Sequence, residues 1–160
     1  MDQIIFSTTG YVHFITATLA LVFGTWVLIA PKGKKLHIQL GYGYLVSMVV
    51  MLITSFMIYR LFDGFGMFHY FSIVSTVTLL GGMVPVYRRK SKDWIIQHFA
   101  FMYWSIMGLY AALAAEIMTR IPETPAMGML GASIFIVMAL ASVYWNWRKP
   151  KWTQEFMGVS

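Results

Sequence analysis

The sequence predicts an all-α integral membrane protein with five transmembrane helices. Of its 160 residues, 59% are hydrophobic and only 11% are charged, whereas about a quarter of the residues in an average soluble chain carry charge. The mean hydropathy of +0.68 agrees. A helix needs about 20 apolar residues to cross a bilayer, so five spans occupy roughly 100 residues and leave only short connections. We therefore expect a single membrane domain formed by residues 1–160.

Apolar runs between charged or Gly/Pro-rich breaks define the five expected spans. The start of the chain carries Asp2 where a cleavable signal peptide has positive charge, so the first run is expected to be a retained helix. The connections read PKGKK, RLFDGFG, RRKSKD and TRIPETPA, and a basic tail, RKPKWTQEF, follows the last span. The expected spans cover residues 10–30, 40–59, 67–87, 94–118 and 127–147.

The distribution of charge predicts the orientation of these spans. Ten of the 12 basic residues lie in the first and third connections and the tail, and only Arg60 and Arg120 lie at the other ends. The positive-inside rule then places the N-terminus outside and the C-terminus inside. Four of the six acidic residues fall on the outer side, in agreement: Asp2, Asp63, Glu116 and Glu123. The basic runs are expected to face the anionic lipid of the inner leaflet rather than nucleic acid.

With this orientation the four histidines fall into two levels. His13 and His69 lie near the outer ends of the first and third spans, and His37 and His98 lie near the inner ends of the second and fourth. The helical rise separates the levels by on the order of 20–25 Å. An isolated histidine at a helix end can simply contact interfacial water, but ionisable groups within spans are functional candidates. We expect at least one pair to bind a metal or a cofactor.

The helical period identifies the residues that share a face with each histidine. Most of them are small or hydroxylated, which allows close helix packing or space for a flat cofactor. Glu116 follows His98 by 18 residues, or five turns, and is expected to face the core near the outer histidines, although Arg120 is an alternative partner for it. These residues are Met102, Ser105, Leu109, Ala112 and Glu116 with His98; Gly41, Tyr44 and Ser55 with His37; Ala17 and Gly24 with His13; and Ser72 and Thr76 with His69.

The first interpretation of the two levels is a pair of b-type haems that carry electrons across the bilayer. Each haem would take two axial histidines from facing helices, His13 with His69 and His37 with His98. The absence of cysteine excludes covalently attached c-type haem, iron–sulfur clusters and disulfides. Cations at the membrane edges are available for the haem propionates, namely Lys34, Lys35, Arg88 and Arg89 inside and Arg60 and Arg120 outside.

This layout resembles that of the ascorbate-reducing di-haem transmembrane cytochromes b. In that family a four-helix core holds one bis-histidine haem near each face, with ligands from alternating helices. The resemblance concerns the layout of residues 8–118 and includes no sequence motif of the family. It implies a four-helix functional core with a peripheral fifth helix, but this chain has five expected spans where those proteins have six.

Two other interpretations remain open from the sequence. His13, His69 and Glu116 form a ligand set suited to zinc or non-haem iron, with Asp63 as a possible fourth group. Such a site would make the protein a metal-dependent hydrolase, but it leaves the inner histidines unexplained. Alternatively, the chain is an accessory or assembly subunit that forms an oligomer or joins a larger membrane complex through the fifth span. The small residues of that span are Gly128, Gly131 and Ala132.

Three stretches also resemble an uncharacterised family of small bacterial multi-pass membrane proteins. They are KGKKLHIQLGYGY (residues 32–44), FGMFHYFSI (65–73) and DWIIQHFAFMYWSIMGLYAALAAEIMTR (93–120). Because these stretches hold three of the histidines and Glu116, the resemblance implies that these positions matter, without naming a reaction. It also implies a location in the bacterial cytoplasmic membrane.

Overall fold

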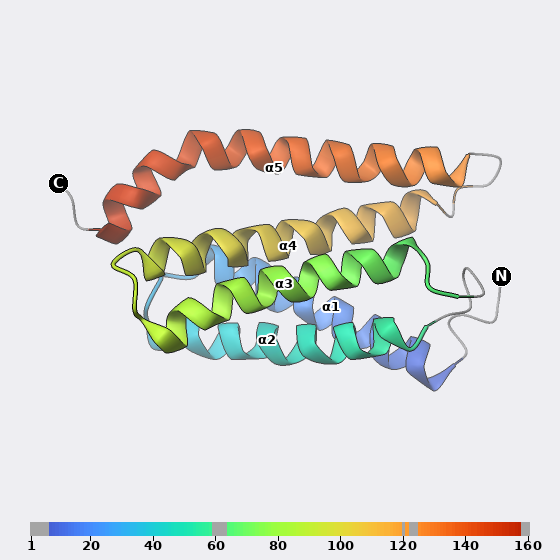
Figure 1. The fold of residues 1–160 in the computed structure, drawn as a ribbon, viewed down its shortest axis with the longest axis horizontal. Coiled ribbons are helices and arrows are strands. Elements are labelled where there is room, and N and C mark those ends of the chain that lie inside the picture. Colours follow the sequence, from blue (N-terminus) through green and yellow to red (C-terminus); the bar gives the residue numbers. More distant parts are fainter. Residues whose placement is uncertain (1–6, 59–63, 120, 122–124, 158–160) are drawn as a thin grey trace. The chain divides into compact units, whose positions relative to one another are not determined.

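The computed structural model of the chain describes residues 7–58, 64–119, 121 and 125–157, and every regular element among them is an α-helix (Figure 1). All five helices are long and apolar enough to cross a membrane. The predicted all-α fold with five spans is therefore confirmed. The helices are α1 (Thr8–Ile29), α2 (Lys35–Phe56), α3 (Met67–Arg88), α4 (Trp94–Met118) and α5 (Ala126–Met157). Asp2, Arg60, Asp63, Arg120 and Glu123 lie outside the described residues.

Two helix boundaries differ from the sequence prediction by five residues or more. Helix α2 begins at Lys35, five residues before the predicted start at residue 40, so His37 lies within its first turn. Helix α5 continues for ten residues beyond the predicted end at residue 147, and Pro150 lies inside it. In both places the helix extends beyond the apolar run, because Lys, Arg, Gln and Glu are good helix formers without being apolar. The segment predicted as a basic tail is therefore helical through Met157.

The chain divides into two compact units, Met1–Val77 and Thr78–Ser160, and the division falls within α3. In the first unit, α1 and α2 run antiparallel and pack along each other (Figure 1). Small residues of α1, Ala20 and Gly24, are buried, and so are Tyr44 and Met48 of α2, whose side chains are fully covered. A Cβ added to Gly43 of α2 would lie 3.1 Å from the ring of Phe23 on α1, so the two helices approach closely there.

In the second unit, α4 packs against α5. The hydroxyl of Tyr103 on α4 donates a hydrogen bond of 2.8 Å to the carbonyl of Ala141 on α5. The C-terminal half of α3 also contacts α4 closely, at Gly81 and Gly82. A Cβ added to Gly81 would lie 2.6 Å from the ring of Phe101, and one added to Gly82 would lie 2.6 Å from Met102 Sδ. Only glycine allows α3 to approach α4 this closely.

The close approach at Gly82 generates a stability prediction. We expect Gly82→Leu to lower the thermal unfolding midpoint of the purified protein in detergent, because overpacking of this kind costs about 1–3 kcal/mol. Gly108→Ala on α4 is the matched control, since no atom lies within 4 Å of its added Cβ; replacing a helical glycine there should leave the midpoint equal or higher. Equal midpoints for the two variants would contradict the described packing of α3 on α4.

The predicted orientation generates a second test. The chain has no cysteine, so a single introduced cysteine is labelled without background. We expect Lys34→Cys to react with a membrane-impermeant maleimide only from the inner side, and Ser7→Cys only from the outer side, because the basic connections remain inside. Labelling of intact cells against inverted vesicles measures this. Reaction of Lys34→Cys from outside would reverse the assignment of the histidine levels.

Candidate functional site

His13 is attached to the last turns of α2 by its ring. Its Nδ1–H donates to the carbonyl of Met51 at 3.2 Å and to Thr54 Oγ1 at 3.1 Å. Because the Met51 carbonyl can only accept, the proton resides on Nδ1, and the lone pair of the neutral ring is on Nε2. Histidines that bind metals in proteins are commonly held this way, with one ring N–H donated to a carbonyl and the other nitrogen directed to the metal.

His69 is held differently, at the start of α3. Its side chain is almost fully buried, with 3% exposed, and its ring stacks on Phe65 at a centroid distance of 4.7 Å. The backbone N–H of Gly66 donates to the ring nitrogen His69 Nδ1 at 3.1 Å, and the backbone N–H of His69 donates to the Gly66 carbonyl at 3.0 Å. This reciprocal pair corresponds to a capping box, in which the third helical residue reaches back to the cap. His69 therefore stabilises the beginning of α3.

The capping bond fixes the proton of His69 on the opposite nitrogen from that of His13. Because Nδ1 accepts from Gly66 N–H, the neutral ring carries its proton on Nε2. A protonated Nε2 donates hydrogen bonds and has no lone pair for a metal. Coordination by His69 would therefore require the bond to Gly66 to break and α3 to lose its cap. If His69 served as an axial ligand, as the sequence predicts, α3 would lose the stabilisation that this cap provides.

The end of α2 connects His13 and His69. His13 bonds Thr54, and the adjacent Ser55 shares a hydrogen bond of 2.7 Å with Ser72 on α3, one turn beyond His69. His69 is also near Phe56, with ring centroids 6.3 Å apart. The first unit thus attaches the His13 and His69 helices to the same end of α2. The predicted faces are found there as well, since Ser72 is buried and Ala17, Gly24 and Thr76 are buried or half-buried.

His98 is bound to α3 within the second unit. Its Nδ1–H donates to the carbonyl of Gly82 at 2.7 Å, so the lone pair of the neutral ring is on Nε2, as in His13. Pro85 lies inside α3 and has no N–H, which removes the usual helical donor to the Gly81 carbonyl next to this site. Because Gly81 and Gly82 have no side chains and Pro85 has no N–H, the backbone carbonyls of α3 are accessible to His98 at this turn.

The bond between His98 and Gly82 was not predicted from the sequence. The sequence pattern that could have predicted this bond is GGMVP, residues 81–85. Paired glycines with a proline three residues after the second predict a helix turn whose carbonyls are accessible to a neighbouring side chain. For His69 the missed signal was its position three residues after Gly66, at the start of the expected third span.

Glu116 does not face the core as expected. It lies in the last turn of α4 and is exposed, whereas Ala111 and Ala115 are buried at 4% and 0% exposure. The buried face of α4 includes Met102, Ser105 and Leu109, as predicted from His98, but its final turns bury the positions one residue earlier. Among the described residues, no three His, Asp or Glu side chains are grouped as a metal site.

The remaining predicted residues have these positions. His37 is half-buried in the first turn of α2 and belongs to the first unit, whereas His98 belongs to the second, so their pairing stays a prediction. Arg89 donates from Nε to the Val86 carbonyl at 3.2 Å and stacks over the ring of Trp94 at 5.1 Å. The cations predicted for the inner edge are all exposed, namely Lys34, Lys35, Arg88 and Arg89. Arg60 and Arg120 lie outside the described residues.

A family model described as "Predicted membrane protein (DUF2306)" matches residues 10–147. The chain belongs to this family. The match covers all four histidines and Glu116, and it confirms the expected membership of a membrane protein family without an assigned function. No curated protein and no solved structure matches the chain. The family description gives a membrane location and no reaction, so function has to be argued from the site.

The capping bond of His69 generates a third prediction. We expect His69→Leu to lower the thermal unfolding midpoint, because losing a helix cap costs about 0.5–2 kcal/mol. His69→Gln is the matched variant, since glutamine at the third helical position can make the same reciprocal bond; it should unfold close to the unmodified protein. Unfolding of purified protein in detergent measures both, and equal losses in the two variants would exclude capping as the role of His69.

Proposed function

We propose that this membrane protein is a b-type cytochrome that moves electrons across the bilayer. In this proposal His98 supplies an axial ligand to a haem at the inner level, and His13 supplies one to a haem at the outer level. The observation that carries the proposal is the pair of hydrogen bonds that fix Nδ1 of His13 and His98 to helix carbonyls. Both bonds place the lone pair of the neutral ring on Nε2, which is the nitrogen that a histidine held in this way presents to haem iron.

The residues fit haem unequally. His13 and His98 fit, because their donor bonds fix the tautomer and orient the ring. His69 does not fit in its capping conformation, because its Nδ1 accepts from Gly66. The proposal therefore changes the outer site from two axial histidines to one, as in proteins with a single proximal histidine. Bound haem would supply an iron that alternates between the ferrous and ferric states.

The chain's own residues would then orient the ligands and limit access of water. Thr54 donates to the Met51 carbonyl at 2.8 Å while accepting from His13, so it holds the ring from the side of α2. Gly82 holds the ring of His98 from α3. At the inner edge, Lys34, Lys35 and Arg88 are exposed cations suited to the haem propionates.

The zinc or non-haem iron alternative receives less support from the same geometry. It requires His69 as a ligand, in competition with the cap, and Glu116 as a core-facing group, although Glu116 is exposed. The accessory-subunit alternative is favoured by one observation. Gly128, Gly131 and Ala132 are exposed on α5, and no atom lies within 4 Å of a Cβ added to Gly131. These small residues are thus available to a partner helix, and the oligomeric state in nanodiscs tests that role.

The cytochrome proposal predicts a specific pattern of haem loss. We expect the purified protein, expressed with adequate haem supply, to show a Soret band that sharpens on reduction. His13→Gln and His98→Gln should each reduce the bound haem from about two per chain to about one, because each removes an axial ligand. His69→Gln should leave both haems in place, since it preserves the cap. Pyridine haemochrome analysis with elemental metal analysis measures this.

Two results would contradict the proposal. A folded, colourless protein would exclude a cytochrome, and stoichiometric zinc in that protein would support the metal-enzyme alternative. Haem loss in His69→Gln equal to that in His13→Gln would restore the outer bis-histidine pair and show that the capping bond breaks on haem binding.

A further inference from the structure

The basic end of α5 is built as a helix that extends beyond the membrane core. With 32 residues α5 is about 48 Å long, whereas the hydrocarbon core of a bilayer is about 30 Å thick. Its apolar part ends at Trp147, and the cations follow at once, with Arg148, Lys149 and Lys151. Tryptophan at the end of an apolar span is typical of the membrane interface. These three cations are therefore expected at the level of the lipid headgroups.

The end of α5 is held against α4 by aromatic contacts. Trp152 lies 4.8 Å from Phe99, and Trp145 stacks on Phe99 at 5.6 Å with an interplanar angle of 19°. Pro150 removes one helical hydrogen bond and permits a bend, and the C-terminal end of α5 bends in Figure 1. Trp152 also lies 5.8 Å from Trp145. The cations therefore project from a fixed surface rather than from a loose tail.

Arg148 is the central cation of this surface. Its guanidinium lies over the rings of Trp147 and Trp152, at 5.9 Å and 5.5 Å. Its Nε is buried and has no hydrogen-bond partner among the described residues. A charged N–H without an acceptor costs free energy, so the guanidinium has donor capacity that the described residues do not use. Arg148 is therefore preorganised for an anionic oxygen.

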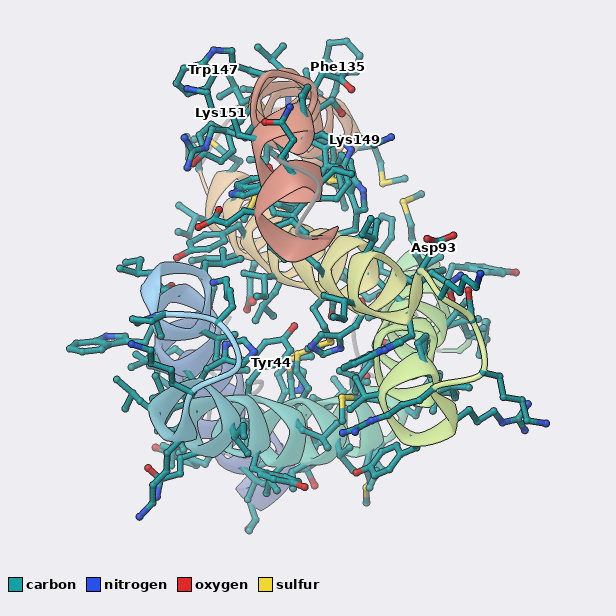
Figure 2. All side chains as sticks on the ribbon, turned by 90° about the vertical axis from the view of Figure 1, so that its left-hand side faces the viewer. Tyr44, Asp93, Phe135, Trp147, Lys149 and Lys151 are labelled. Atoms are coloured by element: carbon teal, nitrogen blue, oxygen red, sulfur yellow. The ribbon has the colours of Figure 1, made fainter. Side chains whose placement is uncertain are left out.

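Lys149 and Lys151 flank Arg148 and carry uncompensated charge. Both are exposed, and Figure 2 shows them on opposite sides of the end of α5, with Trp147 directed away from α4. No carboxylate of the described residues forms an ion pair with Arg148, Lys149 or Lys151. The surface thus combines one oriented guanidinium, two exposed ammonium groups and an interfacial tryptophan.

We propose that this surface, formed by Trp147, Arg148, Lys149, Lys151 and Trp152, binds the phosphate of an anionic phospholipid headgroup. The guanidinium of Arg148 donates to the phosphate, and the two lysines, on opposite sides of the helix, raise the positive potential around it. A lipid is the ligand because the surface begins where the apolar part of α5 ends, so the acyl chains of the same molecule contact the exposed apolar face below it. Juxtamembrane cations of this kind attract anionic lipid.

The test uses the full chain purified in detergent and titrated with phosphatidylglycerol, with bound lipid counted by native mass spectrometry and phosphatidylcholine as the neutral comparison. We expect Arg148→Gln to weaken binding of phosphatidylglycerol about tenfold, because it removes a charge-assisted hydrogen bond. The matched control is Arg89→Gln, which removes the same charge from an arginine that also stacks on a tryptophan but already donates from Nε to Val86. It should weaken binding by less than about twofold.

Each other outcome overturns the proposal. Equal weakening in the two variants would show that only the surface potential attracts lipid, and unchanged binding in Arg148→Gln would show that no site exists there. Displacement of phosphatidylglycerol by millimolar inorganic phosphate would show a site for free anions rather than for lipid. If Arg148→Gln does not elute as a folded species, Arg148→Lys retains the charge without Nε, and undiminished binding in that variant would equally contradict the site.

Discussion

Hydrogen bonds from side chains to the carbonyls of helices are the interaction on which this structure depends. A bilayer offers no water to a polar group within a span, so each one needs a partner in the protein. Most hydroxyls find it one turn earlier on their own helix, as Thr18, Ser72 and Ser142 do. His13, His98 and Tyr103 instead reach a neighbouring helix, at Met51, Gly82 and Ala141. The same bonds that satisfy these groups also join helices that otherwise attract each other weakly in lipid.

These cross-helix bonds divide the histidines by the role each nitrogen can have. A ring that donates from Nδ1 to a carbonyl offers Nε2 as a base or a ligand, and His13 and His98 are of this kind. A ring that accepts at Nδ1 cannot offer Nε2 in its neutral form, and His69 is of that kind. His13, His98 and His69 therefore differ in chemistry although they are the same type of residue. The difference arises entirely from the backbone groups beside them.

The sequence was sufficient for the fold, because hydropathy and the spacing of charges are properties of whole segments. The apolar runs located all five helices, and Gly24, Ser72 and Ser105 are buried as the helical period predicts. It was insufficient where one local contact decides the outcome. His69 looked like a ligand because its position three residues from a helix cap was not considered, and Glu116 was placed in the core by ideal periodicity although the last turns of α4 bury Ala111 and Ala115. The end of α5 was predicted as a tail because the apolar pattern, but not the helix propensity, ends at Trp147.

The aromatic contacts that hold the end of α5 also determine which part of this protein its intrinsic tryptophan fluorescence reports on. Five of its six tryptophans, Trp94, Trp104, Trp145, Trp147 and Trp152, belong to the second unit, and only Trp26 belongs to the first. Trp145 lies within 6.0 Å of both Trp104 and Trp152, measured between ring centroids. Excitation energy absorbed by any one of these three indoles is shared with its neighbours. The intrinsic emission of the chain is therefore mainly a signal from the junction of α4 and α5, and it follows events there far more closely than events around His13.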